Sequence, residues 1–251
     1  MSDIRIFLNG CNGRMGKVIT DICSQEQGVV IVAGADATEA ASSYPVYAVA
    51  ADCKEEFDVI IDFSHVLALP YVISLAKTSK KPLVMCTTGL SADDKKSLTA
   101  LSEKTAVFYS ANMSLGVNVL ISLVQKAAGI LYPGFDIEIV EAHHNQKVDA
   151  PSGTALMIAD AVNDTLDHQL EYVYDRHGEL KKRDPKELGL HSIRGGSIVG
   201  EHSVIFAGPE EVLTISHSAQ TRSVFARGAV AAARFMNGKT TGMYSMKDLI
   251  N

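Results

Sequence analysis

The 251-residue sequence contains no tryptophan and only four cysteines, at positions 11, 23, 53 and 86. None of these cysteines forms a C-x-x-C pair, which argues against both a zinc ribbon and a disulfide-stabilised secreted scaffold. We therefore expect reduced thiols and no metal site. The sequence also lacks an apolar run of the ~18 residues that a membrane span needs, so we expect no membrane partner.

Positive charge is scarce. The chain has 23 Lys and Arg against 29 Asp and Glu, which gives a formal charge of −6 and a pI of about 5.7. Nucleic-acid binding needs a cationic surface, so a nucleic-acid partner is not expected. The sequence begins MSDIRIFLNG, which enters a strand without a signal-peptide pattern, and we expect a soluble cytoplasmic protein.

A glycine-rich turn near the N-terminus follows the first predicted strand. Ile4 to Leu8 reads as a buried strand, and N-G-C-N-G-R-M-G comes directly after it. A helix is predicted over Lys17 to Gln25 and a second strand over Val29 to Ala33, followed by Asp36. Strand, glycine turn, helix, strand and acidic residue occur in this order in dinucleotide-binding βαβ units.

Each part of this unit has a physical role. Gly10 and Gly13 would let backbone N–H groups approach a pyrophosphate, and Gly16 would let the helix lie close to the sheet. The helix N-terminus offers unpaired donors to phosphate, and Asp36 could accept hydrogen bonds from a ribose. The spacing is G-x-x-G-x-x-G rather than G-x-G-x-x-G, so an ordinary turn is the alternative; the surrounding pattern favours a cofactor turn.

The alternation of strands and helices continues to about residue 113. Further strands are predicted over Asp58–Phe63, Pro82–Cys86 and Ala106–Tyr109, and helices over Pro70–Lys77 and Asp93–Lys104. This pattern predicts a parallel sheet covered on both faces. In such sheets ligands bind at the carboxyl ends of the strands, where this chain has small or polar residues: Gly10, Asp36, Phe63-Ser64, Thr87-Thr88 and Asn112.

The stretch EAHHNQKVDAPSGTA, residues 141 to 155, concentrates titratable groups ahead of a predicted helix start. It follows Phe135 to Glu141, whose alternation of apolar and polar residues predicts a half-exposed strand. A metal site, a structural role in loop hydrogen bonding and an anion site that also donates protons are the three interpretations of the histidines. The number of donors beside a helix start favours the anion site.

Several motifs together resemble the dihydrodipicolinate reductase family, whose members act in lysine and diaminopimelate biosynthesis. The histidine–lysine stretch is the most specific of them, and the glycine turn at 9–16 matches the family's cofactor turn. The other matching segments are DFS at 62–64, TTG at 87–89, ANMSLGVN at 111–118, IRGGSIVGEH at 193–202 and SHSAQTRSVFARGA at 216–229. The resemblance spans nearly the whole chain in order.

The resemblance implies an α/β protein with a Rossmann-like N-terminal domain and a C-terminal α+β domain. The first, residues 1–114 with 225–251, would bind the dinucleotide. The second, 115–224, would bind a small dicarboxylate and form a homotetramer. Its later part is expected to contain strands at Ser203–Ala207 and Glu211–His217, and the charged segment Arg176–Lys186 reads as a solvated loop.

Carried over by motif, His143 would be the proton-handling residue and Lys147 its partner donor. His144, Gly153 and Thr154 would hold the substrate. The cofactor residues implied in the same way are Gly10, Cys11, Asn12, Gly13, Arg14, Met15, Asp36, Phe63, Cys86, Thr87, Thr88, Ser110, Ala111, Asn112 and Met113. The expected reaction is reduction of 4-hydroxy-tetrahydrodipicolinate with NADH or NADPH.

One departure from the family pattern bears on the cofactor. Many relatives have an arginine after the acidic ribose residue, whereas this chain has Asp36-Ala37-Thr38. A carboxylate without a neighbouring cation favours the free diol of NADH over the 2′-phosphate of NADPH, although Arg14 could still reach that phosphate. The alternatives are a different nicotinamide-dependent enzyme acting on an amino-dicarboxylate, and a sensor that binds NADH without turnover.

Overall fold

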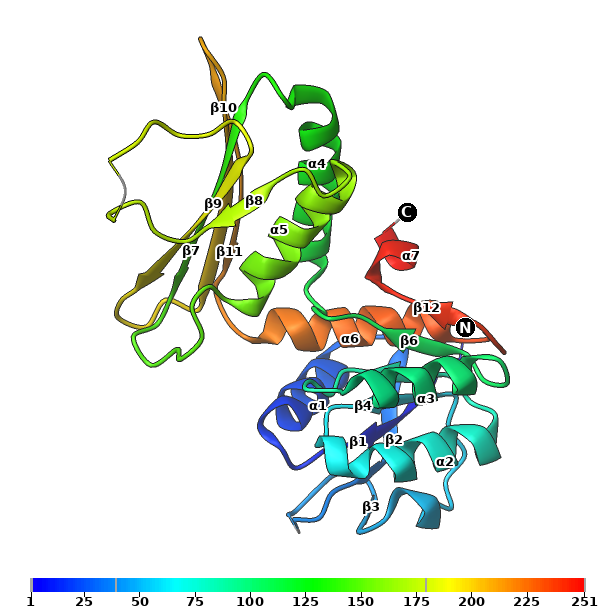
Figure 1. Cartoon of the computed structure of the whole chain (residues 1–251). Helices are drawn as coiled ribbons and strands as arrows, with labels where there is room; N and C mark the ends of the chain where they lie inside the picture. Colours follow the sequence, from blue (N-terminus) through cyan, green and yellow to red (C-terminus); the bar gives the residue numbers. More distant parts are fainter. Residues whose placement is uncertain (1, 39, 179, 251) are drawn as a thin grey trace. The chain divides into compact units, whose positions relative to one another are not determined.

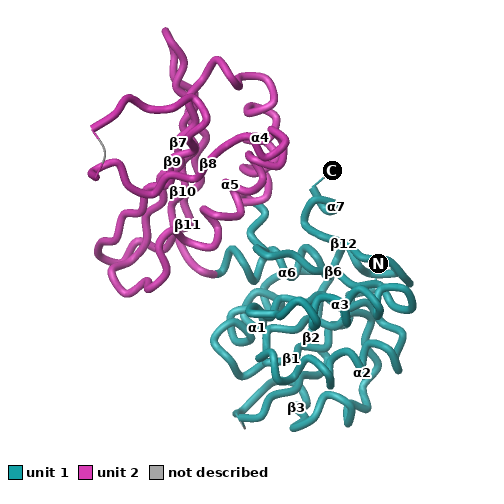
Figure 2. Tube along the Cα trace, in the orientation of Figure 1, with its two compact units in different colours: residues 1–115, 223–251 teal, residues 116–222 magenta. Residues whose placement is uncertain are grey.

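A computed structural model describes residues 2–38, 40–178 and 180–250. The chain divides into two compact units, one formed by residues 1–115 with 223–251 and the other by residues 116–222 (Figure 2). Each is described separately.

The first unit contains a seven-stranded parallel sheet in the order β12-β6-β5-β4-β1-β2-β3 (Figure 1). Every neighbouring pair in it is parallel. Because both faces are covered, the central strands are continuous apolar runs. The strands are β1 (Ile4–Asn9), β2 (Val29–Ala35), β3 (Val46–Tyr47), β4 (Val59–Asp62), β5 (Leu83–Met85), β6 (Val107–Tyr109) and β12 (Met243–Tyr244).

Helices pack on both faces of this sheet. On β1, Ile6 and Leu8 join a core built with α1 (Arg14–Gln25) and α6 (Ser223–Met236). Phe7, which points to the other face, joins a core built with helices on that side. Those helices are α2 (Leu69–Ser79) and α3 (Ala92–Ser102), and the short helices of the unit are η1 (Ala50–Asp52), η2 (Val66–Ala68) and α7 (Met246–Ile250).

Helix α1 begins at Arg14, three residues before the predicted start at Lys17. The prediction placed Gly16 just before the helix, as the residue that lets the helix lie close to the sheet. In the structure Gly16 is inside the first turn, where a Cβ atom would lie 2.2 Å from the carbonyl oxygen of Gly10. Close packing of helix on turn therefore outweighs the helix propensity of this residue.

The second unit has a mixed five-stranded sheet in the order β11-β10-β7-β9-β8. Strands β7, β9 and β8 run parallel, and β10 is antiparallel to both β7 and β11. The helices α4 and α5 share a core with one face of the sheet. The elements are α4 (Leu115–Leu131), β7 (Asp136–His143), α5 (Gly153–Thr165), β8 (Glu171–Val173), β9 (Glu187–Arg194), β10 (Gly200–Ala207) and β11 (Val212–Ala219).

Two expectations for the second unit need correction. Strand β7 continues through His143, so this histidine is at a strand end rather than in the following loop. Arg176 and Arg183, which lie in the segment predicted to be a solvated loop, are also not simply solvated. The guanidinium of Arg183 donates to Asp136 and Glu138 on β7, and Arg176 pairs with Glu138 and Glu187. These ion pairs hold the two arginines against the sheet.

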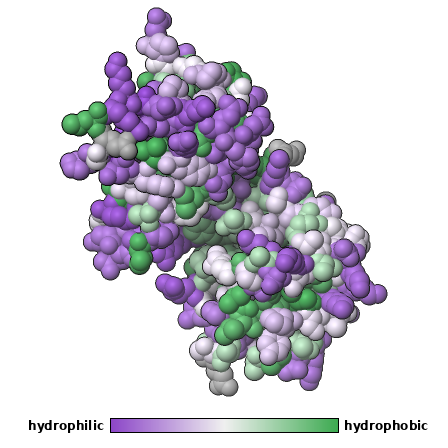
Figure 3. All heavy atoms as spheres, viewed as in Figure 1, coloured by the Kyte–Doolittle hydropathy of each residue, from purple (hydrophilic) through white to green (hydrophobic). Residues whose placement is uncertain are grey.

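The surface mixes hydrophobic and hydrophilic residues on the face shown in Figure 3. In the described parts of the chain, no helix has the length and hydropathy to cross a membrane. The α/β class with a parallel first sheet and a separate α+β unit agrees with the prediction from sequence.

Candidate functional site

The glycine turn after β1 is held close to the neighbouring strand end. Gly10 has a φ of +79°, and a Cβ atom there would lie 2.6 Å from the carbonyl oxygen of Phe63. Only glycine combines this backbone conformation with this close contact. Gly13 caps α1 without a side-chain hydrogen bond, so the first N–H groups of the helix are not satisfied by a capping side chain.

Asp36 connects this turn to the end of β2. Its Oδ2 accepts a hydrogen bond from the backbone N–H of Asn12 at 2.9 Å, and its Oδ1 accepts from Thr38 N–H at 2.9 Å. The Asn12 side chain donates in turn to the carbonyl of Thr38. Asp36 therefore has a fixed orientation, and each carboxylate oxygen keeps lone pairs for a ligand hydroxyl.

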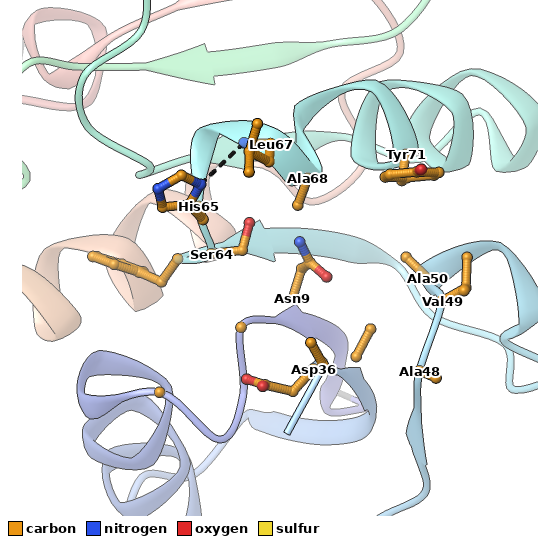
Figure 4. Close-up of a pocket in the computed structure, with 15 residues that line it drawn as sticks. Asn9, Asp36, Ala48, Val49, Ala50, Ser64, His65, Leu67, Ala68 and Tyr71 are labelled. Atoms are coloured by element: carbon orange, nitrogen blue, oxygen red, sulfur yellow. Dashed lines mark hydrogen bonds between the residues drawn. The ribbon is translucent and has the colours of Figure 1, made fainter. Parts of the chain in front are cut away.

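A pocket of about 660 Å³ lies beside this turn (Figure 4). Asn9 and Asp36 line one side of it, while Leu67 and Tyr71 come from the η2–α2 segment. Leu67 is 78% exposed and Tyr71 59% exposed, so both offer apolar surface to a ligand. The complete lining is Asn9, Gly10, Gly13, Ala35, Asp36, Ala37, Ala48, Val49, Ala50, Phe63, Ser64, His65, Leu67, Ala68 and Tyr71.

The charge of this lining bears on the ligand. A second pocket of about 570 Å³ shares Asp36, Ala37 and Ala48 with the first. Among the described residues that line either pocket there is no lysine or arginine, so Asp36 has no cationic neighbour in the lining. Arg14, the first residue of α1, is exposed and lies outside both linings.

Asp62, at the carboxyl end of β4, gathers polar groups from three strand ends. Its carboxylate accepts from Asn9 Nδ2 at 2.7 Å, from Ser64 Oγ at 2.6 Å and from Thr87 Oγ1 at 2.6 Å. The side chain is 1% exposed. Burial raises the pKa of Asp62, and these hydrogen bonds oppose that rise. The sequence-based prediction did not single out this residue.

The remaining residues predicted to contact a cofactor differ in exposure. Arg14, Thr88 and Ala111 are exposed, whereas the side chains of Cys11, Cys86, Asn112 and Met113 are buried; Met15 and Ser110 are partly buried. Burial raises the pKa of Cys11 to about 11 and that of Cys86 well above its usual value, so both thiols stay protonated at neutral pH.

The second unit concentrates polar groups around Glu141 on β7. Glu141 is 1% exposed, and its Oε2 lies 2.6 Å from Nδ1 of His143. Arg194 on β9 donates to both carboxylate oxygens, at 2.7 and 2.8 Å, and the backbone N–H of Ser152 donates at 3.1 Å. Burial raises the pKa of Glu141, but the hydrogen bonds from Arg194 and His143 outweigh it and lower the value to about 2.

His202 on β10 completes this cluster. Its ring lies 5.2 Å from that of His143 in an edge-to-face arrangement, and its Nε2 is 3.0 Å from Ser152 Oγ. His202 is 5% exposed, and its Nδ1 is buried without a hydrogen-bond partner. Burial, followed by the charge of His143, lowers the pKa of His202 to about 4, so this ring is neutral at pH 7.

The loop after β7 carries the predicted lysine. Lys147 Nζ lies 2.7 Å from Asp149 Oδ1, and the backbone N–H of Gly153 also stabilises this carboxylate. The hydrogen bond from Lys147 lowers the pKa of Asp149. His144 is partly exposed, with Nε2 3.4 Å from a guanidinium nitrogen of Arg222.

The N-terminus of α5 is formed by the Ser152-Gly153-Thr154 turn. Ser152 caps the helix by accepting from Ala155 N–H at 3.1 Å. Gly153 is exposed and a Cβ atom there would meet nothing within 4 Å, so no side chain obstructs this end of the helix, where the Asp149 carboxylate accepts from the Gly153 N–H. The fold therefore brings His143, Lys147 and the α5 N-terminus into one cluster with Glu141.

Three residues of this cluster were not predicted from sequence as site residues: Glu141, His202 and, as a partner of Glu141, Arg194. Each lies in a motif that resembles the reductase family, but they are up to 61 residues apart in the chain, and only the pairing of β7 with β9 and β10 places them together. Among the described residues no group of three or more histidine, cysteine or acidic side chains could hold a metal ion.

Comparisons with known proteins agree with this architecture. The sequence profile described as "Dihydrodipicolinate reductase, N-terminus" matches residues 4–113, and that described as "Dihydrodipicolinate reductase, C-terminus" matches residues 116–250. The 4-hydroxy-tetrahydrodipicolinate reductase of Caldanaerobacter subterraneus subsp. tengcongensis is 53% identical over 247 residues, 98% of each chain. That of Clostridium botulinum is 47% identical over 248 residues, again 98% of each.

Solved structures share the fold. A dipicolinate-bound dihydrodipicolinate reductase from a Paenisporosarcina species superposes with a TM-score of 0.78 at 20% identity, covering 97% of each chain. An Agrobacterium radiobacter oxidoreductase in complex with NAD⁺ gives a TM-score of 0.54 at 12% identity, covering 94% of this chain and 88% of the other. With both family profiles matched over almost its full length, the chain belongs to the dihydrodipicolinate reductase family.

Proposed function

We propose that this protein is an enzyme that reduces 4-hydroxy-tetrahydrodipicolinate to tetrahydrodipicolinate with NADH or NADPH, in lysine and diaminopimelate biosynthesis. The single observation that carries the proposal is the cluster of His143, Lys147 and the α5 N-terminus in a chain 53% identical to a 4-hydroxy-tetrahydrodipicolinate reductase. The domain predicted over residues 1–114 and 225–251 would bind the cofactor, and that over 115–224 the substrate.

The residues of the first unit fit a dinucleotide. The unsubstituted Gly10 and the open N-terminus of α1 suit a pyrophosphate, and the oriented Asp36 carboxylate suits the two hydroxyls of a ribose. The predicted cofactor residues from Gly10 to Met15, with Phe63 and the 86–88 and 110–113 segments, would hold the rest. A bound nicotinamide supplies the hydride. The absence of a lysine or arginine from the described pocket linings supports NADH as the preferred form.

The second unit fits a small dicarboxylate. The Asp149 carboxylate already accepts hydrogen bonds from Lys147 and from the backbone N–H of Gly153. These two donors are therefore placed to bind a carboxylate. A substrate carboxylate at the same donors would use Gly153 and Thr154, and His144 would hold it from the loop. This carboxylate would thereby lie beside the positive charge of Lys147 in a chain whose net charge is −6.

His143 and Lys147 would carry the proton chemistry. Loss of the 4-hydroxyl group as water gives a C=C bond conjugated with the imine, and hydride addition to that bond develops negative charge on the substrate. A proton donor beside that charge lowers the barrier. Among the residues that the structure describes, His143 makes a hydrogen bond only through Nδ1, so its Nε2 can exchange a proton with the substrate, and the Lys147 ammonium provides a second donor. A homotetramer in the cytoplasm is the expected setting.

The reaction is tested by following NADH oxidation at 340 nm with freshly generated hydroxytetrahydrodipicolinate. Wild type should turn over, and Lys147→Ala should lose far more in kcat than in NADH affinity. Unchanged turnover by Lys147→Ala would remove the lysine from the chemistry. NADH binding without turnover in wild type would instead support a dinucleotide sensor.

A further inference from the structure

The structure assigns a positioning role to Glu141 and Arg194, which were not among the site residues predicted from sequence. We infer that this buried pair fixes the proton of His143 on Nδ1 and leaves Nε2 as the atom that exchanges a proton with the substrate. The inference deepens the proposed function, because it rests on His143 as the proton-handling group.

The hydrogen-bond pattern determines the tautomer. Glu141 accepts from Arg194 at both oxygens and from the Ser152 N–H, so its carboxylate is held in the ionised form. An ionised carboxylate only accepts hydrogen bonds. Nδ1 of His143, 2.6 Å from Oε2, must therefore be the donor and carry the hydrogen. The equivalent arrangement fixes the tautomer of metal-bound and catalytic histidines.

The other ring nitrogen is available. Among the described residues Nε2 of His143 has no hydrogen-bond partner. The described side-chain nitrogens that are both fully buried and unpaired are Arg194 Nε, His202 Nδ1 and His217 Nδ1, so Nε2 of His143 is not fully buried. The ring also packs over Gly200, where a Cβ atom would lie 3.1 Å from Nε2. Nε2 thus remains accessible at a position fixed by two strands.

Arg194 keeps Glu141 in the form that orients the ring. It donates to both carboxylate oxygens, at 2.7 and 2.8 Å, so Oε2 stays an acceptor for Nδ1 of His143. The titratable ring that packs against His143 is His202 on β10, and His202 in turn feels the charges of His217 on β11 and of Lys147, which is paired with Asp149. His202, the nearest of these rings, is neutral at pH 7 and adds no charge.

The test is ¹⁵N NMR of histidine-labelled full-length protein, with His143 assigned by His143→Gln. In its neutral form, wild-type His143 should carry its hydrogen on Nδ1 and not on Nε2. Glu141→Gln and Arg194→Met should both admit the Nε2–H tautomer, because each removes the ionised carboxylate or the cation that holds it ionised, whereas Arg194→Lys should keep the wild-type tautomer. Rescue by the lysine variant is not expected if Arg194 only fills space.

An Nε2–H tautomer in the wild-type protein would overturn the inference without any variant, so the test stands even if a variant fails to fold. Retention of the wild-type tautomer by both Glu141→Gln and Arg194→Met, with both variants folded by circular dichroism, would also overturn it. Because the NMR readout needs no turnover, failure of the reduction assay with the predicted tautomer intact would reject the proposed function and retain the positioning role.

Discussion

The hydroxyl of Ser152 lies 3.0 Å from Nε2 of His202, and both side chains are buried. The same hydroxyl accepts from Ala155 N–H and so closes the first turn of α5. The proposed carboxylate site is therefore attached to β10 through a neutral histidine. This connection has a consequence for stability at acidic pH.

Protonation of His202 should destabilise the fold. Its pKa is about 4 in the folded chain against an ordinary value of 6.5, because burial disfavours the charged ring. A depressed histidine pKa means that the unfolded chain binds the proton first, so stability falls as the pH drops from about 6.5 towards 4. We expect this residue to cost about 2 kcal/mol in the free energy of unfolding between pH 7 and pH 5.

Urea unfolding at pH 7, 6 and 5 measures this effect. Between pH 7 and pH 5, His202→Gln should lose less free energy of unfolding than wild type. The reductase activities of the two proteins are compared at pH 7. Equal pH dependence in the two proteins would show that His202 is not the responsible group.

Gly200→Ala should displace His143. The new methyl group would lie 3.1 Å from Nε2 and 3.5 Å from Cδ2 of the ring, and the backbone around both residues is fixed in the sheet. Misplacement of a proton-handling group by a fraction of an ångström should lower kcat by about tenfold to a hundredfold. Steady-state kinetics with saturating NADH measures this loss.

Gly129→Ala in α4 is the matched control, because its Cβ would meet only Thr165 Cγ2 at an ordinary 3.6 Å. Its kcat should stay at the wild-type value. If Gly200→Ala has the kinetics of the control, the ring does not need its present position.

Ala37→Arg should shift the cofactor preference towards NADPH. Neither pocket around Asp36 has a lysine or arginine in its described lining, so a 2′-phosphate would face the Asp36 carboxylate without compensation. A guanidinium beside that carboxylate should improve kcat/KM for NADPH relative to NADH by about tenfold. A wild-type enzyme that already prefers NADPH would contradict the assignment of NADH.

Asp62→Asn should weaken both the fold and dinucleotide binding. The carboxylate holds donors from Asn9, Ser64 and Thr87, and an amide of the same shape would turn an NH₂ group towards some of them. The expected cost is about 1–3 kcal/mol in unfolding free energy, with a higher Kd for NADH. Urea unfolding and calorimetric titration measure the two effects.

Ile60→Val on the same strand should cost about 0.5–1.5 kcal/mol through lost packing in the core on the α2–α3 side. Its affinity for NADH should not change. If Asp62→Asn also retained wild-type affinity, Asp62 would be structural only.

The regular elements were largely predictable because their apolar periodicity is strong. The predicted strand at 4–8 and the predicted helix at 93–104 agree with β1 and α3 to within two residues. Helix α4 was missed because its sequence, LGVNVLISLVQKAAGIL, is apolar on most of its surface and gives little amphipathic contrast. The early start of α1 and the extension of β7 to His143 depend on tertiary contacts that local sequence does not express.

The site was predictable only in part. His143, Lys147 and the α5 start are close in sequence, so one motif contains them. The partners that orient them are far apart in sequence. The register of β7 with β9 and β10 brings together Glu141, Arg194 and His202. Asp62 was overlooked for a similar reason, because its hydrogen bonds reach Asn9 and Thr87, 53 and 25 residues away.

Isotope transfer tests the central claim most directly. Hydroxytetrahydrodipicolinate is incubated with the protein and with NADH that carries deuterium at both C4 positions of the nicotinamide. The product is examined by mass spectrometry and NMR. Direct reduction by this protein predicts tetrahydrodipicolinate with a single deuterium at a carbon, formed in step with NADH consumption. Product without deuterium, or NADH that is bound but never consumed, would contradict it.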